Sequence, residues 1–222
     1  MNIVKKWILQ EPRYFDSSQN HAHDWQARLR ILTLASLMVG IIGCSDDKSE
    51  KEHAVTAVSY LTETKLAEQG DAKAQLALAY RYSKGDFVSQ NDAEAVKWLC
   101  KAAEQGLDAA QSQLAWHYTL GKGVPKDDLE AVKWNRKAAD QGYAFSQYKL
   151  GLCYSFGTGV PKETVAAYMW LNLAAASGCA EAIESREFIA QQMNSAQIAE
   201  AQKLSREWKP KKEIASKPNS SQ

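Results

Sequence analysis

A 36-residue period runs through the middle of the chain and constrains its fold more than any other feature. Gly70, Gly106, Gly142 and Gly178 are each 36 residues apart. Between them, columns of Leu, Tyr and Trp recur at the same spacing: Leu78, Leu114 and Leu150; Tyr82, Tyr118 and Tyr154; Trp98, Trp134 and Trp170. A fixed period of about 20–50 residues indicates stacked supersecondary units. We interpret these nine side chains as packing between units, with a binding role for the tryptophans as the alternative.

Each unit has the pattern of two helices joined by a turn. In residues 109–120, Leu114 and Tyr118 are four residues apart and therefore share one helix face. The text GKGVPKDD at 121–128 then interrupts the helix, because glycine permits positive φ and Pro125 cannot continue a helix interior.

That turn has the look of a phosphate-binding loop, but its spacing is wrong. A Walker loop needs G-x-x-x-x-G-K-[ST], so that backbone N–H groups surround the phosphates. Neither the turn at 121–128 nor its second copy, GTGVPKET at 157–164, has this spacing. We therefore interpret both as turns between helices.

Two features near the turns predict local structure. Asp127 and Glu130 have the spacing of a capping box at the start of the following helix, and so do Asn91 and Glu94. The first unit has Phe87 where the later turns have their second glycine. This difference predicts a first turn that is less sharply folded.

The repeated text resembles the Sel-one-like repeat, a branch of the tetratricopeptide superfamily with a longer turn between its helices. The residues that carry the resemblance are Ala-x-x-Gln-x-x-Leu-Gly-x-x-Tyr-x-x-Gly-x-Gly-Val-Pro-Lys, followed by Ala-x-x-Trp-x-x-x-Ala-Ala-x-x-Gly. The third unit supplies all of them, and the second departs at Asp108 and Ala115. The resemblance implies an all-α fold, a right-handed α-solenoid of stacked helix-turn-helix repeats with helical caps. The repeats divide the chain into a half repeat at 56–70, repeats at 71–106, 107–142 and 143–178 and a C-terminal cap at 179–208. Residues 209–222 have no apolar stripe, which predicts a disordered tail.

A second stripe on the first helix of each unit marks a candidate partner-binding groove. Such solenoids bind partners on the concave surface formed by their first helices, and aromatic side chains are enriched where partners dock. The alternative is that half of these residues simply pack between adjacent helices. The candidate groove residues are Tyr80, Lys84, Trp116, Leu120, Phe145, Tyr148 and Phe156.

The only long apolar run, ILTLASLMVGIIG at 31–43, has the features of a signal-peptide core. Its thirteen residues are too few to span a bilayer, which takes about 20. It ends in Ile-Ile-Gly-Cys, which resembles the bacterial lipobox and implies cleavage after residue 43 and lipid on Cys44. Residues 1–43 are then the signal peptide and 44–55 a charged, flexible tether.

The same resemblance implies a lipid-anchored protein of the bacterial envelope, facing the periplasm. Ser45 after the cysteine favours the outer membrane. The alternatives are an uncleaved anchor and an ordinary secretory signal with an incidental cysteine. The 30-residue leader before the apolar run is unusually long and contains Glu11, Asp16 and Asp24, which leaves a start downstream of Met1 open.

The sequence contains no recognisable catalytic or metal-binding pattern. The formal net charge of +1 gives no reason to expect nucleic acid as a partner. The four cysteines form no C-x-x-C, and the four histidines form no H-x-x-x-H. Ser45 to Lys48 match S-x-x-K, but the S-D-N and K-T-G partners are missing. We therefore expect no cofactor and no metal, and we expect His117 to be a surface residue.

Three functions from different classes remain. The first is a non-catalytic scaffold that binds a protein or peptide of unknown identity. The second is an envelope hydrolase or β-lactam-binding enzyme of the cysteine-rich Sel-one-like type, although Cys100, Cys153 and Cys179 occupy three different repeat registers rather than pairs. The third is a structural component that assembles with itself, and the sequence does not give the oligomeric state.

Overall fold

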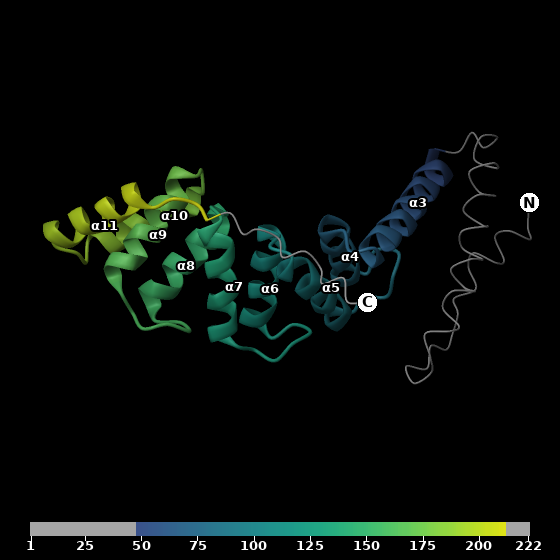
Figure 1. Ribbon diagram of the computed structural model, residues 1–222, viewed down its shortest axis with the longest axis horizontal. Helices are drawn as coiled ribbons and strands as arrows, with labels where there is room; N and C mark the ends of the chain where they lie inside the picture. Colours follow the sequence, from purple (N-terminus) through teal and green to yellow (C-terminus); the bar gives the residue numbers. More distant parts are fainter. Residues whose placement is uncertain (1–47, 212–222) are drawn as a thin grey trace, which may run out of the picture. The chain divides into compact units, whose positions relative to one another are not determined.

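The computed structural model describes residues 48–211, with side chains from residue 58 onward. Within this part of the chain, every regular element is an α-helix, which confirms the predicted all-α repeat fold (Figure 1). A boundary between two units of the chain lies between Val58 and Ser59, and the unit that begins at Ser59 contains the repeats. The helices are α3 (Lys48–Glu68), α4 (Ala72–Lys84), α5 (Asp92–Glu104), α6 (Asp108–Leu120), α7 (Asp128–Asp140), α8 (Ala144–Phe156), α9 (Thr164–Ala176), α10 (Ala180–Ala190) and α11 (Ser195–Glu207).

The helices pack in chain order, as repeats of helix pairs require. Helix α4 packs on α5, α6 on α7 and α8 on α9, while α5–α6 and α7–α8 contacts join one pair to the next. The leucine column lies at the centre of this packing, because Leu78, Leu114 and Leu150 are almost fully buried. Tyr82, Tyr118 and Tyr154 pack at the edges of the same clusters. Each pair therefore buries its apolar stripe against its neighbours.

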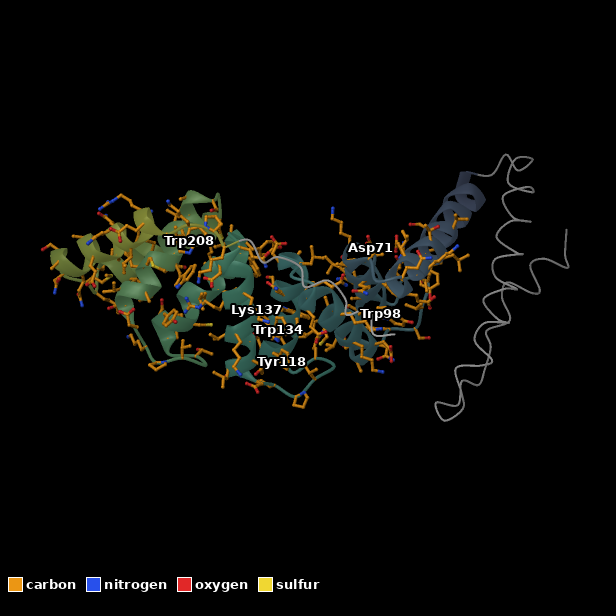
Figure 2. All side chains as sticks on the ribbon, in the orientation of Figure 1. Asp71, Trp98, Tyr118, Trp134, Lys137 and Trp208 are labelled. Atoms are coloured by element: carbon orange, nitrogen blue, oxygen red, sulfur yellow. The ribbon has the colours of Figure 1, made fainter. Side chains whose placement is uncertain are left out.

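The tryptophan column packs between helices, although its three members differ in burial. Trp98 and Trp134 lie on α5 and α7 and are partly buried against the apolar clusters of the first two pairs (Figure 2). Trp170 is only 2% exposed and packs with Val132 and Leu150. The deeper position of Trp170 follows from Trp208, whose ring lies 6.2 Å from that of Trp170, centroid to centroid.

The turn between the two helices of a unit is held by a backbone hydrogen bond that recurs in every copy. The N–H of the N-cap residue donates to the carbonyl oxygen of the tyrosine that recurs every 36 residues: Asn91 to Tyr82, Asp127 to Tyr118 and Glu163 to Tyr154, at 2.9–3.0 Å. This bond explains why each predicted capping box has only one of its two hydrogen bonds. The Asn91 and Asp127 side chains accept from the first-turn N–H groups. The backbone N–H that the glutamate would bind is already used.

The first turn does not differ from the others in the way that its sequence predicts. Phe87 has φ of 62°, close to the 71° of Gly123 and the 68° of Gly159 in the same register. The prediction of a less sharply folded turn is therefore wrong. Phenylalanine adopts a left-handed conformation here at some steric cost, and the Arg81 guanidinium lies 5.9 Å from the centroid of its ring.

A ladder of glutamines joins one unit to the next and ends at the third. Gln75 and Gln111 are buried, and each Oε1 accepts a hydrogen bond of 2.8 Å from a glutamine 30 residues later, Gln105 and Gln141. In the third unit Ser177 occupies that register. The buried Oε1 of Gln147 consequently has no hydrogen-bond partner among the described residues.

Replacing Ser177 with glutamine should stabilise the protein by about 1 kcal/mol, because the new side chain can satisfy the buried Gln147 oxygen. The backbone is already suitable, since Ser177 has φ and ψ of −89° and 9°, against −81° and −8° at Gln141. Urea unfolding of the wild type and Ser177→Gln gives the difference. The reverse change, Gln141→Ser, should cost a similar amount, and equal stability of all three proteins would contradict this explanation.

Both ends of the repeat array differ in detail from the predicted boundaries. Helix α3 begins at Lys48, so the residues from 48 to 55 are helical where the sequence predicted a flexible tether. At the other end, Asn194 and Gln197 form a capping box at the start of α11. Beyond α11, the Lys211 N–H donates to the Asp140 carbonyl oxygen at 2.7 Å. The chain after Trp208 therefore folds back onto the end of α7 before the described part ends.

Candidate functional site

A cavity of about 810 Å³ lies along the first helices of the units, and we call it the inner cavity. Its lining comes mostly from α4 and α6, with the start of α8 at one end. The second helices contribute only Asp92 and Leu99. The lining residues are Glu63, Lys73, Leu76, Ala77, Ala79, Tyr80, Arg81, Ser83, Lys84, Asp86, Asp92, Leu99, Ala109, Ser112, Gln113, Trp116, His117, Lys122, Tyr143 and Phe145.

Four of the seven candidate groove residues line the inner cavity: Tyr80, Lys84, Trp116 and Phe145. Their exposure is high for large side chains, with Tyr80 at 61%, Phe145 at 44% and Trp116 at 40%. They come from three successive units. Tyr80 and Trp116 share one register of the first helix, whereas Phe145 has the register of Lys73 and Ala109, which also line the cavity. A large aromatic side chain left half in water is the type of residue that anchors protein interfaces.

The other three candidate groove residues lie elsewhere. Phe156 lines a separate cavity of about 230 Å³ between α8 and α10, together with Leu152 and Phe188. Leu120 is exposed and Tyr148 partly buried, and neither lines a cavity described here. The stripe predicted as one continuous groove is thus divided between two cavities.

Charged residues that the stripe did not include also line the inner cavity. Arg81 is buried in it, and its guanidinium binds both carboxylate oxygens of Glu63, at 2.6 and 3.0 Å, and Oδ2 of Asp86 at 2.9 Å. The arginine lowers the pKa of the Glu63 carboxyl, and hydrogen bonding to Glu63 raises the pKa of Arg81. The network therefore fixes the end of α3 against α4, and the Arg81 charge is fully compensated by the two carboxylates.

His117 occupies the register of Arg81 in the second unit. Like Arg81, it is buried and contacts the turn that follows its helix. It is 2% exposed, and its Nδ1 lies 2.8 Å from the Lys122 carbonyl oxygen in the turn. The prediction of a surface histidine is therefore wrong, because the turn folds back over the ring. The sequence shows that His117 shares the register of Arg81, but this register alone does not reveal that the turn covers the ring.

Glu63→Gln should lower the free energy of unfolding by about 2 kcal/mol at pH 7, because a charge-assisted hydrogen bond to a buried arginine is lost. The lowered pKa of Glu63 sets the pH dependence: its stabilisation is complete above the ordinary carboxyl value of 4.5 and disappears as the pH falls through the folded-state pKa below that value. Urea unfolding of wild type and Glu63→Gln at pH 7 and pH 3 measures both. A difference that is equal at the two pH values would contradict the account.

The described residues offer little for catalysis or metal binding. They contain no group of His, Cys, Asp or Glu that could hold a metal ion. Cys100, Cys153 and Cys179 are free thiols, and burial raises the pKa of each. A thiol with a raised pKa is a weak nucleophile at neutral pH. Within residues 48–211, no helix combines the length and apolar character that crossing a membrane requires.

Comparison with known proteins identifies the repeats. The Sel1 repeat matches residues 72–107, 108–143 and 144–179, one residue after the units predicted from the period. A Sel1 repeat protein from Oxalobacter formigenes is 42% identical, with a TM-score of 0.54, and the match covers 57% of this chain and 96% of that one. This chain belongs to the Sel1 repeat family.

A second Sel1-like structure covers more of the chain. It is a protective antigen of uropathogenic Escherichia coli strains that displays an SLR fold, with 32% identity and a TM-score of 0.62. The match covers 84% of this Sel1 repeat protein but only 38% of the antigen. Among curated proteins, none matches this chain. Sel1 repeat proteins are typically non-catalytic scaffolds for protein–protein interaction, and the predicted family and solenoid fold are confirmed.

Proposed function

We propose that this Sel1 repeat protein is a non-catalytic scaffold of the bacterial envelope that binds a peptide or protein segment in the inner cavity. The observation that carries the proposal is the row of half-exposed aromatic side chains Tyr80, Trp116 and Phe145 from three successive units. The leucine column and the turn hydrogen bonds hold the helices that carry them, so the backbone positions of the aromatic row are set before a partner arrives. A preorganised surface binds with a smaller loss of conformational entropy.

Tyr80→Ala together with Trp116→Ala should abolish co-purification of the partner from envelope extracts, because it removes two aromatic anchors. Neither side chain is part of the buried core, so the variant should keep its fold, which circular dichroism can verify. Leu129→Ala is the matched control, since Leu129 is 53% exposed on α7 and does not line the cavity. Loss of the partner in the control but not in the cavity variant would contradict the proposed site.

The envelope location rests on Cys44, which lies outside the described residues. Its support is the Ile-Ile-Gly-Cys text at the end of the apolar run at 31–43. In this proposal the cysteine carries lipid and holds the repeats at the outer membrane, facing the periplasm. Two or more acyl chains anchor a protein stably, whereas a single chain binds only weakly.

Cys44→Ser should release the protein into the soluble periplasmic fraction, or leave it unprocessed with its signal attached, because the lipid attachment site is lost. The measurement is fractionation of cells labelled with a radioactive fatty acid. Wild type should be labelled and membrane-bound. Equal membrane retention of both proteins, with label in neither, would show that residues 31–43 remain as an uncleaved anchor.

A further inference from the structure

The charges of the inner cavity are not balanced once its internal ion pairs are set aside. Arg81 pairs with both Glu63 and Asp86, and these three groups together keep one negative charge. Three lysines remain, Lys73, Lys84 and Lys122, and none of them forms an ion pair with any described residue. Asp92 is the one remaining carboxylate of the lining. The lining as a whole has four basic side chains, the three lysines and Arg81, against three carboxylates, Glu63, Asp86 and Asp92. The excess is one positive charge, and the lysines that carry it are not paired with a carboxylate of the lining.

The free lysines lie beside the exposed aromatic rings. The Lys84 Nζ is 5.7 Å from the centroid of Tyr80, and the Lys122 Nζ is 5.4 Å from that of Trp116. Within about 6 Å an ammonium group is attracted to the ring face, so each lysine is held next to an apolar surface. At the end of the cavity, the Lys149 Nζ is 4.9 Å from the centroid of Phe145.

We infer that the partner segment is acidic and apolar together, with carboxylates that meet Lys84 and Lys122 and apolar side chains that rest on Tyr80, Trp116 and Phe145. The inference rests on the proposed function and specifies its partner. Opposite charge across an interface favours the correct partner and disfavours basic ones. Because a lysine lies beside an exposed aromatic ring in each of the three units, although at different registers, the segment is extended across α4, α6 and the start of α8.

The test uses the full chain in a neutral detergent and three fluorescein-labelled peptides of one length. The acidic peptide alternates glutamate with leucine or phenylalanine, and the other two carry glutamine or lysine in place of glutamate. Fluorescence anisotropy should show the acidic peptide binding about tenfold more tightly than the neutral one, and the basic peptide not binding. Its affinity should fall as salt is raised.

The matched variants separate cavity charge from total charge. Lys84→Gln with Lys122→Gln should weaken binding of the acidic peptide about tenfold. Lys101→Gln with Lys137→Gln removes the same charge from lysines that also lie over tryptophans, at 3.9 and 4.2 Å, but outside the cavity. This control should leave the affinity unchanged. Equal effects of the two double variants, or equal binding of the three peptides, would overturn the inference.

The same variants distinguish this inference from the proposed function. If the envelope partner is lost with Tyr80→Ala and Trp116→Ala but kept with Lys84→Gln and Lys122→Gln, the cavity binds a partner of other chemistry and only the inference fails. If the partner is kept in both double variants, the proposed site itself is wrong. Loss of the partner in both supports the inference.

Discussion

Gly123→Ala is expected to lower the free energy of unfolding by about 3–5 kcal/mol, which combines two separate costs. The first is conformational, because Gly123 has φ of 71° and a side chain there is strained. The second is steric, because a Cβ would lie 2.2 Å from the backbone carbonyl oxygen of Asp92. Asp92 begins α5, so relief of the clash must move the turn of the second unit away from the first.

Gly178→Ala is the control that isolates the conformational cost. Gly178 has φ of 89°, but a Cβ there would meet no atom within 4 Å. Its expected cost is therefore only about 1–2 kcal/mol. Urea unfolding of both variants measures the two losses. Equal destabilisation would mean that the close approach of the turn to α5 contributes nothing to stability.

Trp170→Ala should cost about 3–5 kcal/mol, because it removes a large buried side chain and leaves a cavity. Trp170 is 2% exposed and packs with Val132, Leu150 and Trp208. Trp116→Ala is the matched change in an exposed tryptophan and should cost less than about 1 kcal/mol. Thermal unfolding followed by circular dichroism measures both. A larger loss for Trp116→Ala would reverse the assignment of the two tryptophans to binding and packing.

The fold could be predicted almost entirely from the period, because a residue that recurs at one position has the same structural role in every unit. Leu114 recurs since every unit needs the same buried contact, and Gly121 recurs since every first helix ends in a left-handed residue. The prediction failed where one unit differs from the others. Phe87 adopts the glycine conformation because the backbone hydrogen bonds of the turn determine it, which a single substitution does not reveal.

The candidate site could be predicted less completely. The helical spacing placed Tyr80 and Trp116 on one face, which lines the inner cavity, because spacing within one helix fixes direction. It could not show that Phe156 faces another cavity, since that depends on how α10 packs against α8. It also missed Lys122, which lies in a turn outside the helical period. The position of a turn residue follows from tertiary packing rather than from periodicity.

The central claim is that the inner cavity is where the partner binds, and photo-crosslinking in living cells tests it most directly. A benzoylphenylalanine at position 116 places the reactive group in the cavity, and the same residue at position 129 places it on α7 outside the cavity. The account predicts a discrete crosslinked product from position 116, whose yield falls when the acidic peptide occupies the cavity. It predicts no product from position 129. A product from position 129 alone would contradict it.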